Sequence, residues 1–206
     1  MKPGKIVCIG WNYRSHVTEL ESELPEVPAV FLKPSSCMVG DGDDIVIPEG
    51  VTNVQHEVEL ALVIGVPGRC IPESEALSHV SHVAVFNDVS ARDMQSRARA
   101  EGNPWDLSKG IDTFGPMSVP VPVGEVPPLD SLHLTLTVNG EVRQDGNTRD
   151  MIFGIPWIIS YISGYMTLEE GDVIITGTPE GVSEIRRGDT VCASIDGIGS
   201  VTNRVV

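Results

Sequence analysis

The sequence is short of basic residues. Only 14 Lys and Arg residues stand against 29 Asp and Glu residues, and only four of the 14 are Lys, so the formal net charge is -15. A surface this negative repels the phosphate backbone of nucleic acids and the anionic head groups of lipids. We therefore expect neither nucleic acid nor a membrane as a partner. The acidic excess fits a salt-rich cytoplasm as well as a simple requirement for solubility.

Closely spaced cysteines and long apolar runs are also lacking. Cys8, Cys37, Cys70 and Cys192 are scattered along the chain, so the sequence indicates neither a zinc knuckle nor a small disulfide framework. We expect reduced, mostly buried thiols. No stretch approaches the roughly 20 apolar residues of a membrane span, and the apolar run near the N-terminus is too short for a signal peptide. A cytoplasmic location is the resulting expectation.

Residues that form turns are abundant. The 21 Gly and 15 Pro indicate many turns rather than long helices, and a chain of 206 residues fits one domain. No repeat or linker divides the sequence, so we expect a single domain over 1–206. Strands are predicted at 5–10, 56–66, 82–90, 171–178 and 189–206, a hairpin with an Asn-Gly turn at 132–144, and short helices at 13–24, 72–80 and 155–166. This pattern predicts a mixed β (α+β) fold with short flanking helices.

The strand at 56–66 carries two carboxylates on one face. Side chains alternate across a strand, so Glu57 and Glu59 share one face with Ala61 and Val63. The other face is formed by Val58, Leu60, Leu62 and Ile64. Two neighbouring carboxylates repel one another when they are desolvated, unless a cation neutralises them. A bound metal ion would explain the pair. A solvated edge strand with a wet Glu face is the alternative.

A third carboxylate follows the next strand. Asp88 comes directly after the apolar run VAVF, and Arg92, Asp93 and Gln95 follow within two helical turns. Polar residues at the end of a strand are common at functional sites. Taken alone, Asp88 is equally well explained as the N-cap of a helix.

Six segments, in order, resemble the motifs of the fumarylacetoacetate hydrolase family. They are GWNYRSHVTE, FLKP, HEVEL, DVSARDMQ, KGIDTFGP and TGTPEGV, and they run from Gly10 to Val182. Six motifs with tight internal spacing make an accidental match improbable. The resemblance implies a β-roll or β-sandwich with short helices. Trp11 replaces the basic residue that is usual in the first motif, and MSV at 117–119 departs from the pattern that often follows the fifth.

The resemblance also implies a set of site residues. Glu57, Glu59 and Asp88 would be the metal ligands, and three carboxylates without Cys or His suit Mg²⁺ or Mn²⁺, with Ca²⁺ as a substitute, rather than Zn²⁺. The catalytic residues would be His16, Glu19 and Lys109, and the substrate-binding residues Arg92, Gln95 and Thr178. His16 and Glu19 are three apart, so a short helix would place them on one face to activate a water molecule. Thr178, between Gly and Pro, is equally well explained as a turn residue.

The activity expected from the resemblance is hydrolysis of an acylpyruvate or related β-diketo 2-oxo acid. The metal would polarise the keto oxygen and stabilise an enolate, while His16 and Glu19 activate water. Decarboxylation of oxaloacetate and isomerisation of a hydroxymuconate-type diacid would use the same metal site. A protein that binds a metal and a dicarboxylate without catalysis is an alternative of another class. A homodimer is expected from the family and from Trp157 and Tyr161 on the apolar helix.

Overall fold

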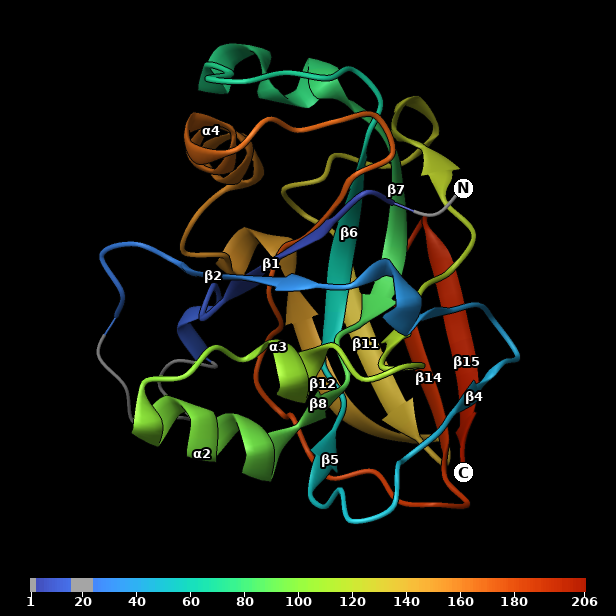
Figure 1. The fold of residues 1–206 in the computed structure, drawn as a ribbon. Helices are drawn as coiled ribbons and strands as arrows, with labels where there is room; N and C mark the ends of the chain where they lie inside the picture. Colours follow the sequence, from blue (N-terminus) through green and yellow to red (C-terminus); the bar gives the residue numbers. More distant parts are fainter. Residues whose placement is uncertain (1–2, 16–23) are drawn as a thin grey trace.

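Two β-sheets dominate the computed structural model, which describes residues 3–15 and 24–206 (Figure 1). The first sheet has six strands, in the spatial order β10 (Val121–Pro122), β7 (Val80–Asn87), β6 (Val58–Ile64), β13 (Val173–Ile175), β1 (Ile6–Gly10) and β2 (Ala29–Lys33). The second has five, in the order β12 (Glu141–Asn147), β11 (His133–Val138), β14 (Thr190–Ile195), β15 (Gly199–Val205) and β4 (Asp44–Ile45). Two small sheets pair β3 (Met38–Val39) with β9 (Gly115–Pro116), and β5 (Val54–Gln55) with β8 (Ser90–Ala91). The expected mixed β fold is confirmed.

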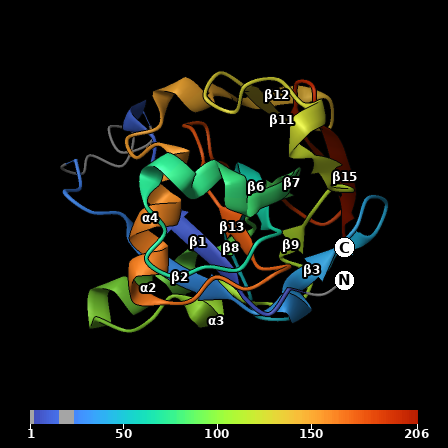
Figure 2. The same cartoon turned by 90° about the horizontal axis from the view of Figure 1, so that it is seen from above.

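The main core lies between the two large sheets. One face of β6 contributes Val58, Leu60, Leu62 and Ile64, and these side chains share a single buried cluster with apolar residues of β11, β14 and β15. Ala61, on the other face of β6, belongs to a smaller cluster. Seen from above, β11 and β12 lie on the opposite side of the molecule from β2 and β3 (Figure 2). The face of β6 that carries Glu57 and Glu59 is therefore turned away from the main core.

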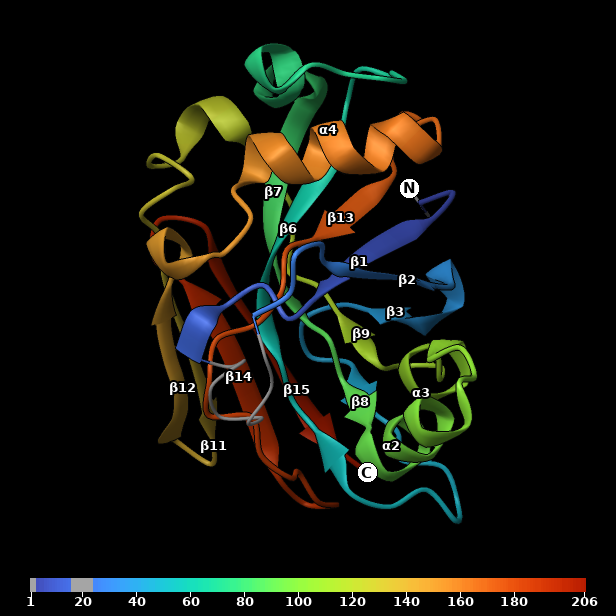
Figure 3. The same cartoon turned by 90° about the vertical axis from the view of Figure 1, so that its left-hand side faces the viewer.

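Short helices cover the two ends of the six-stranded sheet. The α-helices with assigned bounds are α2 (Arg92–Glu101), α3 (Asp106–Lys109) and α4 (Ile155–Tyr165), and the 3₁₀ helices are η1 (Ser35–Cys37), η2 (Glu73–His79), η3 (Val123–Glu125) and η4 (Thr148–Asp150). Figure 3 shows α4 at one end of β6, β7 and β13, and α2 with α3 at the other end beside β8. In the described part of the chain, no helix has the length and hydropathy needed to cross a bilayer.

Most of the predicted elements are present. In the hairpin turn, Asn139 and Gly140 have φ values of 53° and 81°, as a type I′ turn requires. Helix α4 has Pro in its first turn. The segment at 72–80 forms a 3₁₀ helix after Pro72. Most of the helix predicted at 13–24 falls outside the described residues.

The cysteines are less buried than expected. Cys8 and Cys37 are buried, as predicted, but Cys70 is exposed and Cys192 is partly exposed. All four are free thiols. Cys70 has a left-handed backbone with φ of 53°, and it lies in the irregular segment between β6 and η2, where no strand alternation fixes the direction of its side chain. The prediction of mostly buried thiols therefore holds for only two of them.

Candidate active site

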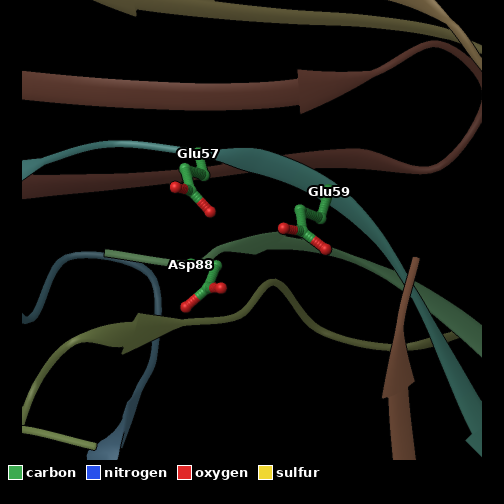
Figure 4. Close-up of side chains that lie close together, drawn as sticks. All are labelled: Glu57, Glu59 and Asp88. Carbon is green, nitrogen blue, oxygen red and sulfur yellow. The ribbon is translucent and has the colours of Figure 1, made fainter. Parts of the chain in front are cut away.

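Three carboxylates converge where the beginning of β6 meets the end of β7 in the six-stranded sheet. Glu59 lies in β6, Glu57 directly precedes that strand, and Asp88 directly follows β7, which pairs antiparallel with β6. Val58 lies opposite Asn87 in this register, so the beginning of β6 and the end of β7 meet. One oxygen atom of each carboxylate lies within 4.8 Å of the others. Figure 4 shows the three side chains pointing into a common space.

The position of these carboxylates excludes two alternative explanations of the sequence pattern: a solvated edge strand that carries Glu57 and Glu59, and a helix N-cap at Asp88. Strand β6 is not an edge strand, because it lies between β7 and β13, and Glu57 and Glu59 are only 5% and 2% exposed. The edge-strand explanation is therefore wrong. The N-cap explanation of Asp88 is also wrong, since α2 begins at Arg92, its N-cap is Ala91, and no side chain caps it.

Among the described residues, three cationic side chains bond directly to two of the carboxylates, Glu57 and Asp88. Lys109 Nζ lies 2.7 Å from Glu57 Oε2 and 2.7 Å from Asp88 Oδ2. Lys33 Nζ donates to Asp88 Oδ1 at 2.6 Å, and Arg92 donates to Glu57. Both lysines are buried. Three positive groups thus face three carboxyl groups, which offsets the desolvation cost of the acidic cluster.

Burial shifts the pKa values of Glu59 and Lys109 in opposite directions. Burial raises the pKa of Glu59 well above its usual value, and the Asp88 and Glu57 carboxylates raise it further. Burial lowers the pKa of Lys109, but the same two carboxylates outweigh that effect, so the pKa of Lys109 is raised overall. Glu59 accepts a hydrogen bond from the backbone N–H of Gly177. A cation placed between the carboxylates would stabilise the ionised form of all three.

The loop after β13 is built closely against Glu59. Ile175 pairs with Ala61, so Gly177, two residues later, comes opposite Glu59. Gly177 has a φ of +95°, and a Cβ atom there would lie 2.8 Å from Asn12 Cβ. Glycine is therefore required, both by the backbone conformation and by the close approach of the segment after β1.

Thr178 is fixed by a buried polar network. Its hydroxyl donates to the Val58 carbonyl at 2.9 Å and accepts from Gln144 Nε2 at 2.8 Å. Gln144 Oε1 in turn lies 2.9 Å from His56 Nδ1, and His56 Nε2 lies 2.9 Å from Ser183 Oγ. Burial lowers the pKa of His56. The hydroxyl of Thr178 thus fixes the loop after β13 against β6 and β12.

Arg92 and Gln95 lie together at the start of α2. Arg92 donates to Gln95 Oε1 and to Glu57, and its Nε donates to Gln55 Oε1 at 2.8 Å. The sequence predicted that both residues bind the substrate. The structure brings them to the site, where Arg92 also bridges α2 to a member of the acidic cluster.

A cavity of about 110 Å³ opens above the carboxylates. Its wall combines the acidic cluster with aromatic and basic side chains. The lining residues are Ile9, Gly10, Trp11, Phe31, Glu57, Glu59, Asp88, Arg92, Gln95, Ser96, Arg99, Trp105, Lys109 and Thr178. The arrangement can hold a small anionic molecule between a carboxylate-bound cation and basic side chains.

Two of the predicted site residues, His16 and Glu19, lie outside the described residues, and three residues of the site were not predicted. Lys33 and Gln144 were not predicted as site residues, although Lys33 stands in the FLKP motif, and Arg99 was also missed. Gln144 contacts residues that are more than 30 positions away in the sequence, so local sequence patterns hold no sign of its role.

The fold and the site together define a class of protein: a strand-rich domain with a buried carboxylate triad suited to a divalent cation. The family model "Fumarylacetoacetate (FAA) hydrolase C-terminal" matches residues 5–206. The mitochondrial oxaloacetate tautomerase of Arabidopsis thaliana is 49% identical over 197 residues, which cover 96% of this chain and 88% of the relative.

Two solved structures are also similar. One is fumarylpyruvate hydrolase from Pseudomonas aeruginosa in complex with Mn²⁺ and pyruvate, with 33% identity, a TM-score of 0.96, and coverage of 99% of this chain and 90% of that one. The other is 5-carboxymethyl-2-hydroxymuconate delta-isomerase from Mycobacterium smegmatis, with 39% identity, a TM-score of 0.90, and coverage of 100% and 80%. This chain belongs to the fumarylacetoacetate hydrolase family, as its motifs predicted.

Proposed function

We propose that this protein is a divalent-metal-dependent enzyme that interconverts the keto and enol forms of a small 2-oxo dicarboxylate such as oxaloacetate. The observation that carries the proposal is the buried carboxylate triad with Lys109 Nζ at 2.7 Å from two of its members, at the base of the cavity. The similarity to the Arabidopsis oxaloacetate tautomerase supports the choice of substrate.

The donor set fits Mg²⁺ or Mn²⁺. Glu57, Glu59 and Asp88 offer hard oxygen ligands within 4.8 Å of one another, and the similar hydrolase structure contains Mn²⁺. When bound, such an ion would supply the positive charge that polarises the keto group and stabilises its enolate. Lys109 is placed to donate a hydrogen bond to the oxygen that becomes negative. Arg92, Gln95 and Thr178 line the same cavity and orient the substrate.

Hydrolysis of an acylpyruvate is the second candidate, favoured by the similarity to fumarylpyruvate hydrolase. Hydrolysis and tautomerisation share the enolate, but only hydrolysis needs an activated water molecule. Decarboxylation of oxaloacetate and isomerisation of a hydroxymuconate-type diacid use the same enolate chemistry. His16 with Glu19 stays the predicted pair that moves protons or activates water.

One set of assays separates these activities. The purified protein is stripped of metal, reloaded with Mg²⁺ or Mn²⁺, and given enol-oxaloacetate, an acylpyruvate and a hydroxymuconate-type diacid. The proposal predicts metal-dependent decay of the enol absorbance, faster than release of carbon dioxide or cleavage of the acylpyruvate. Oxalate, a planar mimic of the pyruvate enolate, should inhibit only in the presence of metal. Tautomerisation that is unaffected by metal removal would contradict the proposal.

Self-association and location stay predictions. Phe153 lies two residues before α4, and its ring stacks with those of Trp157 and Tyr161 on the helix, with neighbouring ring centroids 4.7 Å apart. Tyr165 continues the row at 5.2 Å. Sedimentation of the wild type and of a Tyr165→Glu variant tests whether this row supports the expected homodimer.

The Arabidopsis relative is mitochondrial by name, so the cytoplasmic location needs a direct fractionation experiment.

A further inference from the structure

The cavity has a basic residue at its rim that the proposed chemistry does not use. Helix α2 contributes Arg92, Gln95, Ser96 and Arg99 to the cavity wall. These positions are spaced by three, four and seven residues, so they form one face of the helix. Arg92 begins the row beside the acidic cluster, and Arg99 ends it two turns further along the helix.

Arg99 differs from the cations at the base of the cavity in its partners. Lys109 and Arg92 donate to carboxylates of the triad. Arg99 instead places its guanidinium carbon 5.0 Å from the centroid of the Trp11 ring. Within residues 3–15 and 24–206, no salt bridge to Arg99 is formed. Its side chain donates no hydrogen bond within these described residues either, so its donors are available for a carboxylate on a bound molecule.

Trp11 is a well-anchored platform for this arginine. It packs edge-on against Trp105 at 5.4 Å between ring centroids, and Trp105 contacts Phe31 at 5.5 Å. The next residue, Asn12, donates to the carbonyl groups of Phe153 and Thr176. Trp11 itself has a left-handed backbone with φ of 60°. A stacked guanidinium loses less conformational freedom when it binds a planar anion.

We propose that Arg99, held over Trp11, binds the second carboxylate of the substrate and so selects 2-oxo dicarboxylates over 2-oxo monocarboxylates. This inference rests on the proposed function, in which the 2-oxo acid end of the substrate binds at the triad. A guanidinium matches a carboxylate with two parallel hydrogen bonds. The chain has a formal net charge of -15, which repels a dianion. Arg99 at the rim of the cavity offsets this repulsion where the substrate enters.

The test measures binding, with matched ligands and a matched control. Oxalate is displaced from the Mn²⁺-loaded protein by oxaloacetate or 2-oxobutanoate, which have four carbons, and by 2-oxoglutarate or 2-oxopentanoate, which have five. Within each pair, only the first ligand has a distal carboxylate. The variants are Arg99→Met, Arg99→Lys and Trp11→Ala, with Arg97→Met as the control. Arg97 is an exposed residue of α2 outside the cavity wall, so this control makes the same charge change without touching the site.

We expect the wild type to prefer the dicarboxylate of at least one pair. Arg99→Met should weaken binding of that dicarboxylate by about tenfold or more, since even one charge-assisted hydrogen bond usually contributes about a factor of ten, and it should leave the binding of oxalate and the monocarboxylates unchanged. Arg99→Lys should retain part of the preference, Trp11→Ala should lose part of it, and Arg97→Met should retain all of it.

Three results would overturn the inference: a wild type without any preference, a preference that survives Arg99→Met, or an equal loss for all ligands. Turnover is measured separately. Binding that needs Arg99, in a protein that does not tautomerise oxaloacetate, would uphold the inference and overturn the proposed function. Absence of metal-dependent binding of every 2-oxo acid and of oxalate would overturn both.

Discussion

Replacing Lys109 by methionine should make the stability of the protein depend on metal. The ammonium group lies 2.7 Å from both Glu57 and Asp88, close to the point where the three carboxylates converge. Methionine keeps the length and apolar character of the side chain but removes the charge. Among the residues that the structure describes, Lys33 and Arg92 would then remain as cationic partners of the metal-free triad.

The expected effect is large. Removing one partner of a buried ion pair costs about 3–5 kcal/mol. In a domain of 206 residues, each kcal/mol changes Tm by roughly 2–4 °C, so the metal-free variant should unfold roughly 6–20 °C below the wild type. A bound divalent ion replaces the missing charge, so saturating Mn²⁺ should reduce the deficit to less than half.

Thermal unfolding followed by circular dichroism, with EDTA or with Mn²⁺, measures both quantities. Lys33→Met is the matched comparison, because Lys33 bonds to Asp88 but also donates to the Val89 carbonyl at 3.2 Å, a contact that a metal at the triad does not replace. Its deficit should persist with Mn²⁺. Equal deficits for Lys109→Met with and without metal would show that the ion does not bind where this ammonium group lies.

Three further predictions concern other groups. Glu59→Gln should weaken Mg²⁺ binding in calorimetry and abolish turnover but leave the fold intact, because repulsion within the triad falls; unchanged metal affinity would exclude Glu59 as a ligand. His16→Ala should slow acylpyruvate hydrolysis by about 10² to 10⁴-fold and oxaloacetate decarboxylation far less. Both rates are measured in parallel, and an equal loss of the two activities would exclude water activation by His16. The hydrogen bond from His133 to Asp145 raises the pKa of His133 above 6.5. This contact should therefore stabilise the fold below pH 6.5 and cease to do so as the pH rises through the higher folded-state pKa; NMR titration should show that pKa falling in Asp145→Asn, and no change would refute the assignment.

The local parts of the site could be predicted from the sequence. Strand alternation places Glu57 and Glu59 on one face, and a change from apolar to polar residues marks Asp88 at the end of the next strand. Two consecutive strands usually pair as neighbours, which agrees with the grouping of these three carboxylates that the family resemblance implied. The Asn-Gly turn of the hairpin was predicted on equally local grounds, because both residues tolerate positive φ.

The long-range parts could not be predicted in this way. A half-buried edge strand and a central strand with a functional face have the same alternating pattern, and only the order of the sheet separates them. The bond from Lys33 to Asp88 joins residues 55 positions apart, and that from Gln144 to His56 joins residues 88 positions apart. Neither pairing has a period or spacing that a single sequence could reveal. Arg99 was missed for the same reason, since its partner Trp11 lies far away in the sequence, directly after β1.

The use of basic residues in this chain favours a dianionic substrate. The sequence has only four lysines, yet Lys33 and Lys109 are both buried against the triad. With Arg92, they balance the three carboxylates when all of these are ionised. A divalent ion bound there would leave two positive charges at the base of the cavity, where Lys33 and Lys109 are buried. A 2-oxo monocarboxylate would neutralise one of them, whereas a 2-oxo dicarboxylate would neutralise both, and Arg99 lies at the rim where its second carboxylate would enter. Because uncompensated charge is costly in a desolvated site, the charge balance favours the dicarboxylate independently of any single contact.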